Sequence, residues 1–261
     1  MQIELCVLAS GSSGNAIYVA TEDTRLLIDA GLSTKQIEIR LESIGVKPSS
    51  ISAICLSHEH SDHTSGARVL QKRYQIPIYA NQPTAKILKR VPKGDEINFH
   101  IFQTGAPFSI GSLTLEPFNI PHDASEPVGF RISNGTTRIG IVTDIGMSTH
   151  LVTEKLKGCS CLVVEANHDI DLLQEAPRPW SLKQRIRSRQ GHLSNIEAAQ
   201  LISASATDQL NHVILAHLSS DCNTPETALN TVRSQLRLEK LNHLTLEVSG
   251  AKEPSAIWRS Q

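Results

Sequence analysis

Residues 57–66 read SHEHSDHTSG and place three histidines and an aspartate within six positions, His58, His60, Asp62 and His63. From the composition of the chain, an H-x-H-x-D-H pattern is expected by chance only about 0.0007 times. Imidazole and carboxylate groups are the ligands that hold Zn²⁺, Mn²⁺ and iron in proteins. The pattern therefore predicts a metal site, and the alternative interpretation is a solvated polar loop.

The histidine stretch follows an apolar run, residues 51–57, that we expect to be a buried strand. Three more candidate ligands follow apolar runs downstream: His122 in IPHDAS, Asp144 in IVTDIG and His217 in ILAHLSS. Because strand ends meet at a common edge of a sheet, these side chains are expected near the histidine stretch. Asp144 is the candidate bridge, since one carboxylate can hold two cations about 3.5–4 Å apart.

Apolar periodicity predicts mixed strands and helices at both ends of the chain and a β-rich middle. Strands are expected over residues 3–9, 16–21, 25–31, 51–57, 76–81, 97–102, 109–120, 127–133, 137–144, 161–167, 212–219 and 243–249. Helices are expected over residues 34–44, 66–74, 181–189, 196–206 and 226–236. We predict one layered α/β domain spanning residues 1–261, with sheets packed face to face and helices outside.

The overall composition is that of an ordinary globular protein, with 39% hydrophobic residues and a formal net charge of −1. Such a charge creates no global field for nucleic acid, so any such contact needs a local basic patch. We expect no signal peptide at the N-terminus and no membrane helix, which needs ~20 apolar residues. Five scattered cysteines favour a reducing cytoplasm over a disulfide framework.

Nine stretches together resemble one family, and they run from residue 8 to about residue 226. They are LASGSSGN, LLIDAGLS, LSHEHSDHTSG, PIYAN, PHDASEPVGF, TDIG, EANHD, GHLSN and LAHLSSDCNTPE. The pattern resembles the metallo-β-lactamase fold superfamily, in its WalJ/YycJ-like branch. This resemblance implies a four-layer αββα sandwich, a site for two divalent metal ions and a nuclease-type phosphodiesterase activity.

The resemblance also implies a division of the ligands between the two ions. His58, His60 and His122 would hold one ion, Asp62, His63 and His217 the other, and Asp144 would be shared. Asp29, in LLIDAGLS, would brace the metal loop without binding an ion. His168, in VVEANHD at another strand end, remains a rival ligand. The ligand set suits Mn²⁺ and Zn²⁺ alike, and iron is also compatible.

A general acid is suggested by the GHLSN stretch. His192 resembles the histidine that tRNA-processing members of the fold use to protonate the leaving group, and Glu165 resembles the carboxylate that orients it. We group these two residues with Asp62 as the catalytic set. The alternative for His192 is a structural role in a loop that caps a helix.

The only concentrated basic segment lies just before His192. Arg178, Lys183, Arg185, Arg187 and Arg189 carry five positive charges, with no acidic residue between Arg178 and His192. We expect Arg185, Arg187 and Arg189 to bind phosphates and Trp180 to stack on a base. The alternative is a solvated helix face, and no extended arm or inserted clamp domain is evident.

A second candidate for phosphate binding is the loop at residues 10–15, SGSSGN, which is rich in small donors. Ser12, Ser13 and Asn15 could contact phosphate there. An ordinary hairpin turn explains the stretch equally well.

Three functions are compatible with these residues. The first is a metal-dependent exonuclease on DNA, acting from the 5′ end as the resemblance implies. The second is a small-molecule hydrolase for a cyclic phosphodiester, a thioester or a lactam. The third is a metal-binding regulatory protein without catalysis, which the full ligand set disfavours because a structural zinc site closes with four ligands. The residues do not decide the oligomeric state.

Overall fold

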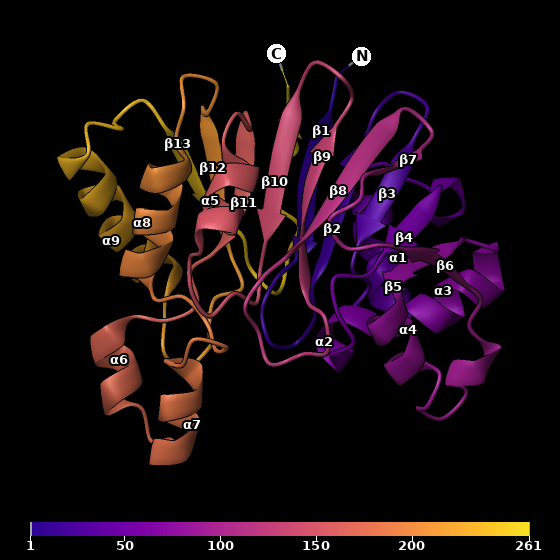
Figure 1. Cartoon of the computed structure of the whole chain (residues 1–261), viewed down its shortest axis with the longest axis horizontal. Coiled ribbons are helices and arrows are strands. Elements are labelled where there is room, and N and C mark those ends of the chain that lie inside the picture. Colours follow the sequence, from indigo (N-terminus) through magenta and orange to yellow (C-terminus); the bar gives the residue numbers. More distant parts are fainter. Residues whose placement is uncertain (1, 261) are drawn as a thin grey trace.

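Two seven-stranded sheets lie at the centre of the structure, a computed structural model that describes residues 2–260 (Figure 1). The first sheet has the order β14 (Trp258–Arg259), β1 (Glu4–Ala9), β2 (Ala16–Ala20), β3 (Arg25–Ile28), β4 (Ala53–Cys55), β5 (Ile78–Asn81) and β6 (Phe99–Phe102). The second has the order β13 (Thr245–Val248), β12 (His212–Ala216), β11 (Cys161–Glu165), β10 (Arg138–Val142), β9 (Val128–Ser133), β8 (Leu113–Asn119) and β7 (Phe108–Ile110).

The two sheets share one apolar core, and each has a second core on its outer face. Side chains alternate across a strand, so Leu5 and Val7 of β1 join the core between the sheets while Leu8 faces outward. Ile214 and Leu215 of β12 divide in the same way. Because both faces of these strands are covered, their sequences are continuous apolar runs rather than alternating ones.

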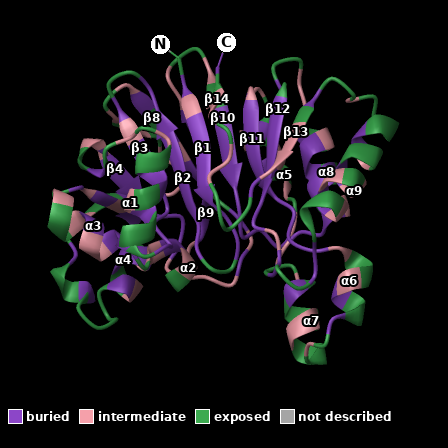
Figure 2. Ribbon diagram, turned by 180° about the vertical axis from the view of Figure 1, so that it is seen from behind, coloured by how far each residue is buried: buried purple, intermediate pink, exposed green. Residues whose placement is uncertain are grey.

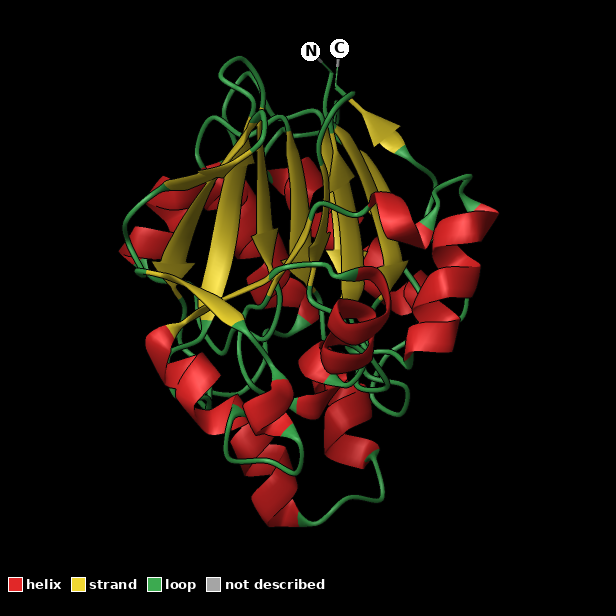
Figure 3. Ribbon diagram, turned by 90° about the vertical axis from the view of Figure 1, so that its right-hand side faces the viewer, coloured by secondary structure: helices red, strands yellow, loops and turns green. Residues whose placement is uncertain are grey.

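Helices cover the outer face of each sheet (Figure 3). The first sheet packs against α1 (Thr34–Ser43), α3 (Ala67–Tyr74) and α4 (Gln82–Leu88). The second packs against α5 (His150–Leu156), α8 (Asn195–Ser205) and α9 (Pro225–Leu238). The predicted αββα sandwich is confirmed. Within residues 2–260, none of these helices combines the length and the apolarity needed to span a bilayer.

Polar segments gather at one edge of the sandwich. Strands β3 to β6 run parallel, as do β10 to β13, so their carboxyl ends lie together. The short helix α2 (Ser61–Thr64) lies at this edge, and α6 (Ile170–Glu175) and α7 (Trp180–Ile186) extend beyond it (Figure 1). Both α6 and α7 keep much of their surface exposed (Figure 2).

Several element boundaries differ from the sequence prediction. The strand expected over residues 51–57 is paired only over Ala53–Cys55, and part of the histidine stretch, predicted as a loop, is the helix α2. The basic helix ends at Ile186 instead of residue 189. Helices α4, α5 and α6 were not predicted, because seven residues or fewer contain too few turns to show a helical period.

Candidate metal centre

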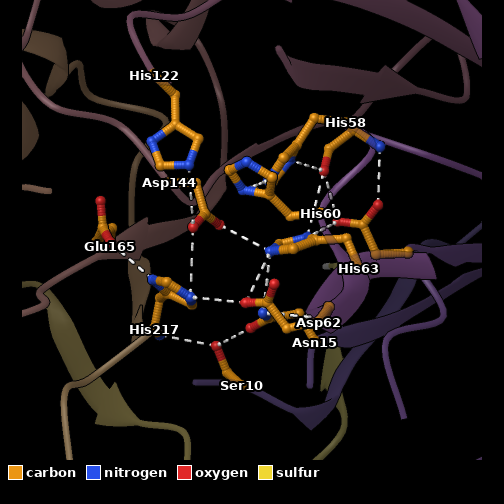
Figure 4. A network of polar contacts seen from close by, with 12 residues as sticks. Ser10, Asn15, His58, His60, Asp62, His63, His122, Asp144, Glu165 and His217 are labelled. Carbon is orange, nitrogen blue, oxygen red and sulfur yellow. Dashed lines mark hydrogen bonds and ion pairs between the residues drawn. The ribbon is translucent and has the colours of Figure 1, made fainter. Parts of the chain in front are cut away.

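The strand ends place the candidate ligands next to one another, as the sequence predicts. Asp29 directly follows β3, Asp144 lies two residues after β10, and His217 directly follows β12. Glu165 is the last residue of β11, and its register partner on β12 is Ala216. The histidine stretch follows β4 of the first sheet, while Asp144, Glu165 and His217 lie at strand ends of the second, so both sheets contribute to one site (Figure 4).

Three histidines form the first group that could hold an ion. The ligand atoms of His58, His60 and His122 all lie within 4.8 Å of one another. His58 Nε2 is 3.1 Å from His60 Nδ1, and the ring of His122 is centred 5.2 Å from each of the other two rings. These three side chains therefore converge on one point.

The second group combines two carboxylates and two imidazoles, Asp62, His63, Asp144 and His217. Asp144 lies between its partners, with Oδ2 3.0 Å from His63 Nε2 and Oδ1 3.4 Å from His217 Nε2. The same Oδ1 is 3.8 Å from Nε2 of His122, a member of the first group. Asp144 therefore lies between the two groups.

Each buried histidine of these two groups has a partner at its Nδ1 atom, so that Nε2 faces the centre. His63 Nδ1 donates to Asp29 at 2.7 Å, His217 Nδ1 to Glu165 at 2.7 Å, and His122 Nδ1 to the carbonyl oxygen of Gly191 at 3.2 Å. His58 Nδ1 lies 2.9 Å from Ser57 Oγ, which donates to Asp29. Such partners fix the tautomer and orientation of a metal ligand.

Two of the inward-facing ligand atoms find no hydrogen-bond partner among the described residues. Within residues 2–260, Asp144 Oδ2 and His217 Nε2 are buried and accept or donate no hydrogen bond. Buried polar atoms are rarely left in this state, because each costs about 1–3 kcal/mol. A divalent cation would satisfy both, so the residues fit a metal ion.

Carboxylates and imidazoles of the site shift one another's pKa values toward their charged forms. Burial raises the pKa of Asp144, but His217 and His63 outweigh it and hold this pKa well below its usual range. Burial lowers the pKa of His217, yet Asp144 and Asp62 raise it to about 10. The carboxylates are therefore ionised, and the imidazole of His217 carries a proton that a bound cation would replace.

Backbone geometry at the strand ends is unusual. Asp29, Asp144 and His217 have φ angles of 62°, 55° and 55°, in the left-handed region. Asp and His tolerate this region better than most residues, but it still stores strain. All three residues lie just beyond the end of a strand, where the chain leaves its sheet.

A glycine of the LLIDAGLS stretch allows the loops to approach. A Cβ atom on Gly31 would lie 1.6 Å from the carbonyl oxygen of Asp62. Around this contact, Asn15 N donates to Asp62 O and Gly31 N to Asn15 O, each at 2.8 Å. Gly31 and Ser57 are residues whose roles the sequence analysis missed, although both lie inside quoted motifs.

Glu59 was also missed. This residue lies between His58 and His60, and its Oε1 accepts a hydrogen bond from Ser125 N at 2.8 Å. The contact joins the histidine stretch to the loop that carries His122.

His192, the candidate general acid, lies next to the metal centre. His192 Nδ1 donates to Glu165 Oε1 at 2.7 Å, the same oxygen that accepts from His217. The other oxygen of Glu165 accepts from Ile145 N at 2.9 Å. Burial raises the pKa of Glu165, but His192 and His217 lower it to about 2. Burial lowers the pKa of His192, and Glu165 more than reverses this, so the pKa is raised.

His168, the rival ligand, belongs to none of the metal-binding groups found within residues 2–260. Its side chain is buried, its Nδ1 atom has no hydrogen-bond partner among these residues, and its backbone forms a bridge with Ser194. The structure therefore places His168 beside the GHLSN loop, outside the convergent side chains.

Of the predicted phosphate-binding residues, five are exposed and one, Asn15, is buried. Arg187 and Arg189 are exposed, and the exposed Arg185 is paired with Asp123 at 2.6 Å. Ser12 and Ser13 are also exposed. Asn15 is only 2% exposed, and its amide contacts Gly11 O, Asp62 O and His63 Nε2. These contacts favour a positioning role for Asn15 over direct contact with phosphate.

Comparisons with known proteins agree with this geometry. The family model described as "Beta-lactamase superfamily domain" matches residues 24–217. The chain is 37% identical to the exodeoxyribonuclease YycJ of Bacillus anthracis over 244 residues, covering 92% of this chain and 91% of that protein. It is also 37% identical to the exodeoxyribonuclease WalJ of Streptococcus pneumoniae, covering 88% and 87%.

A solved structure confirms the fold independently. The metallo-β-lactamase fold protein YhfI from Bacillus subtilis superposes with a TM-score of 0.77 over the full length of both chains, at 16% identity. The chain therefore belongs to the beta-lactamase superfamily, as a metal-dependent hydrolase of the branch that contains YycJ and WalJ.

Proposed function

We propose that this protein is a two-metal phosphodiesterase that digests DNA from the 5′ end. The observation that supports it most strongly is the convergence of six ligand side chains around a seventh, Asp144, beside a histidine that a buried carboxylate orients. The relatives named exodeoxyribonucleases favour DNA as the substrate. Mn²⁺ and Zn²⁺ both suit ligands of this kind.

The ligands divide as the sequence analysis proposes. His58, His60 and His122 would hold one ion, Asp62, His63 and His217 the other, and Asp144 would bridge them. Two such ions supply a nucleophilic water near neutral pH and stabilise charge on a phosphoryl oxygen. Asp29 keeps His63 in position from outside this set.

His192 would protonate the leaving alkoxide. Its Nδ1 atom is held by Glu165, so Nε2 is the atom that can deliver a proton. The raised pKa of His192 keeps that proton in place near neutral pH. Such a positioned acid contributes about 10²–10⁴-fold to the rate of a reaction with a poor leaving group.

The basic segment would hold the DNA strand. Arg185, Arg187 and Arg189 lie on or just after α7, beside the loop of His192, and Trp180 at the start of α7 is 64% exposed. Exposed guanidinium groups bind phosphates, and an exposed indole can stack on a base. Ser12 and Ser13, in the loop at residues 10–15, add exposed hydroxyl donors.

We further propose a cytoplasmic location and a single hydrolase domain. The five cysteines are all free and buried, which suits a reducing compartment. The core shared by both sheets supports one domain.

A gel time course tests this function. Mn²⁺-loaded protein is mixed with matched single- and double-stranded DNA and RNA, each labelled at the 3′ end. A stepwise ladder that starts at the 5′ end of DNA and disappears on chelation is the expected result. Intact polymers together with rapid turnover of a simple phosphodiester would instead indicate a small-molecule hydrolase.

A further inference from the structure

A groove between α4 and the strand β6 carries cations that no step described so far uses. Lys86, Lys89 and Arg90 line it from α4 and the turn that follows, and Phe99 and Ile101 line it from β6. We call it the α4 groove. Its volume is about 350 Å³, within the range of about 300–1,000 Å³ that is typical of ligand sites.

The stretch of chain that forms this groove is strongly basic. Residues 63–94 contain seven lysines and arginines and no aspartate or glutamate, in a chain whose net charge is −1. This stretch was not among the sequence predictions, because its cations are spread over α3, α4 and the turns after them instead of forming one run. They are Arg68, Lys72, Arg73, Lys86, Lys89, Arg90 and Lys93.

The three cations of the groove have no carboxylate partner. Two arginines of α3 are paired with glutamates, but within residues 2–260 no ion pair involves Lys86, Lys89 or Arg90. All three are exposed. Lys86 precedes Lys89 by three residues and Arg90 by four, so they share one face and repel one another. An anion bound along this face would relieve the repulsion.

The start of α4 is attached to the two loops that carry metal ligands. Thr84 Oγ1 donates to Glu59 Oε2, in the histidine stretch, at 3.5 Å. Asn81, which caps α4, donates from Nδ2 to Glu126 O, in the loop after His122, at 2.7 Å. Figure 1 shows α4 and α7 on opposite sides of α2, at the same edge of the sandwich. A polymer that crosses the metal centre from α7 therefore reaches the α4 groove.

The lining of the groove suits a single strand of nucleic acid. Positive groups along a groove follow a phosphate backbone, and an aromatic side chain beside them accepts an unstacked base. Phe99 is partly exposed and Ile101 is 50% exposed, so apolar surface lies next to the cations. The bases of a duplex are stacked inside it and do not reach such a surface. An acidic protein segment could use the cations, but the connection to the metal loops favours the substrate.

We propose that the α4 groove binds the part of the DNA strand that remains after each cleavage. This inference rests on the proposed function. His192 would protonate the leaving oxygen, and its backbone N donates to Ile186 O at the end of α7, so the leaving nucleotide lies on the α7 side of the centre. The rest of the strand continues toward α4, where Lys86, Lys89 and Arg90 hold its phosphates. The groove would keep the strand bound between cleavages and make the rate depend on strand length.

The experiment compares a dinucleotide with a single strand of about 16 nucleotides, long enough to span the site of a single-strand-binding fold. The values of kcat and KM are measured for the Mn²⁺-loaded protein. The Kd is measured by fluorescence anisotropy over a series of salt concentrations in EDTA, where the DNA stays intact. The wild-type protein is expected to favour the long strand in kcat/KM by about tenfold or more, because only this strand reaches the groove.

The variant Lys86→Gln/Lys89→Gln/Arg90→Gln removes the charge of the groove. Each phosphate contact to a single strand contributes ~0.7 to the slope of log Kd against log salt, so the loss of three should reduce the slope by about 2. The KM of the long strand should rise by about tenfold or more, while its kcat and the turnover of the dinucleotide stay within a few-fold of the wild type.

The control variant removes an equal charge from another surface. Arg233, Arg237 and Lys240 are exposed and lie on α9 or just after it, where the chain leads to the start of β13 and away from the metal centre. Arg233→Gln/Arg237→Gln/Lys240→Gln should change neither the salt slope nor the preference for the long strand. Equal effects of the two triple variants would show a general influence of net charge and overturn the inference.

The remaining outcomes separate the inference from the function on which it rests. An unchanged salt slope and length preference in the α4 variant would overturn the groove assignment and leave the nuclease intact, and so would equal losses on the dinucleotide and the long strand. A variant that aggregates but binds the long strand normally would show that the cations only protect the edge strand β6 from pairing. Loss of binding to polyglutamate alone would assign the groove to an acidic protein. A wild-type protein that hydrolyses no DNA would remove the proposed function, and the salt slope would still decide whether the groove binds a single strand.

Discussion

Replacing Glu165 by glutamine tests the link between the candidate acid and the metal ligands. Glu165 is fully buried, and its Oε1 atom accepts from His192 and His217 at 2.7 Å each. Its Oε2 atom accepts from Ile145 N at 2.9 Å. A glutamine keeps the shape but carries one NH₂ group. Whichever way the amide turns, its NH₂ group faces N–H groups that donate hydrogen bonds to the carboxylate in the wild type.

The stability that Glu165→Gln loses can be worked out from the pKa of Glu165. A carboxyl at about 2 instead of 4.5 corresponds to a stabilisation on the order of 3 kcal/mol, at about 1.36 kcal/mol for each pH unit. Since the folded pKa lies below the ordinary value, this stabilisation is complete above about pH 4.5 and disappears as the pH falls toward 2. We therefore expect Glu165→Gln to unfold more easily at pH 7 than the wild type, with the difference shrinking in acid.

Catalysis should change in a way that depends on the leaving group. At saturating Mn²⁺, we expect kcat on DNA to fall by about 10²–10⁴, because His192 loses its orientation. Hydrolysis of bis(p-nitrophenyl) phosphate should fall far less, since p-nitrophenolate needs no acid. The measurements are urea unfolding at several pH values and kcat on both substrates.

A neighbouring carboxylate provides the control. Glu197 forms a capping box with Ser194 at the start of α8, and glutamine can replace glutamate in that motif. Glu197→Gln should therefore behave like the wild type. Equal losses of kcat on both substrates in Glu165→Gln, or a DNA turnover within a few-fold of the wild type, would refute the reasoning.

Three further outcomes are expected. The pKa of His217 is raised to about 10, so a bound cation must displace its proton. Metal affinity should therefore rise with pH below about 10. Calorimetry in buffers of different ionisation enthalpy should detect the release of the proton. Gly31→Ala should lower both metal content and Tm, since its Cβ would lie 1.6 Å from Asp62 O, whereas Gly250→Ala, where nothing lies within 4 Å, should do neither. Trp180→Ala should weaken single-stranded DNA binding by about 1–3 kcal/mol without changing Tm, because a 64% exposed indole contributes little to packing; unchanged anisotropy titrations would contradict stacking.

The layered sheets and the clustering of the candidate ligands could both be predicted from the sequence, for the same physical reason. Apolar runs that are buried on both faces end at one edge, and polar residues placed directly after them must share it. Asp144 and His217 were found in this way, from their position after a strand.

What could not be predicted depends on contacts between distant loops. The hydrogen bond from His122 Nδ1 to Gly191 O joins residues 69 positions apart, and nothing local marks either one as a partner. Similarly, the sequence of SGSSGN does not tell a phosphate contact from a loop support, and only the burial of Asn15 favours the second. The short helices were missed because their stability comes from caps and tertiary packing rather than from periodicity.

Because the two sheets contribute different ligands, a bound metal would act as a cross-link within the chain. The histidine stretch comes from the first sheet, while His122, Asp144 and His217 come from the second. Holding His63 and His217 together closes a loop that spans more than half of the polypeptide, and such closure restricts the unfolded chain. Any ligand of the native state also stabilises it, by an amount that grows with the logarithm of the ligand concentration once this exceeds Kd. The survival of this protein against proteases should therefore follow the metal supply of the cell, so that its abundance reports on metal availability as well as on synthesis.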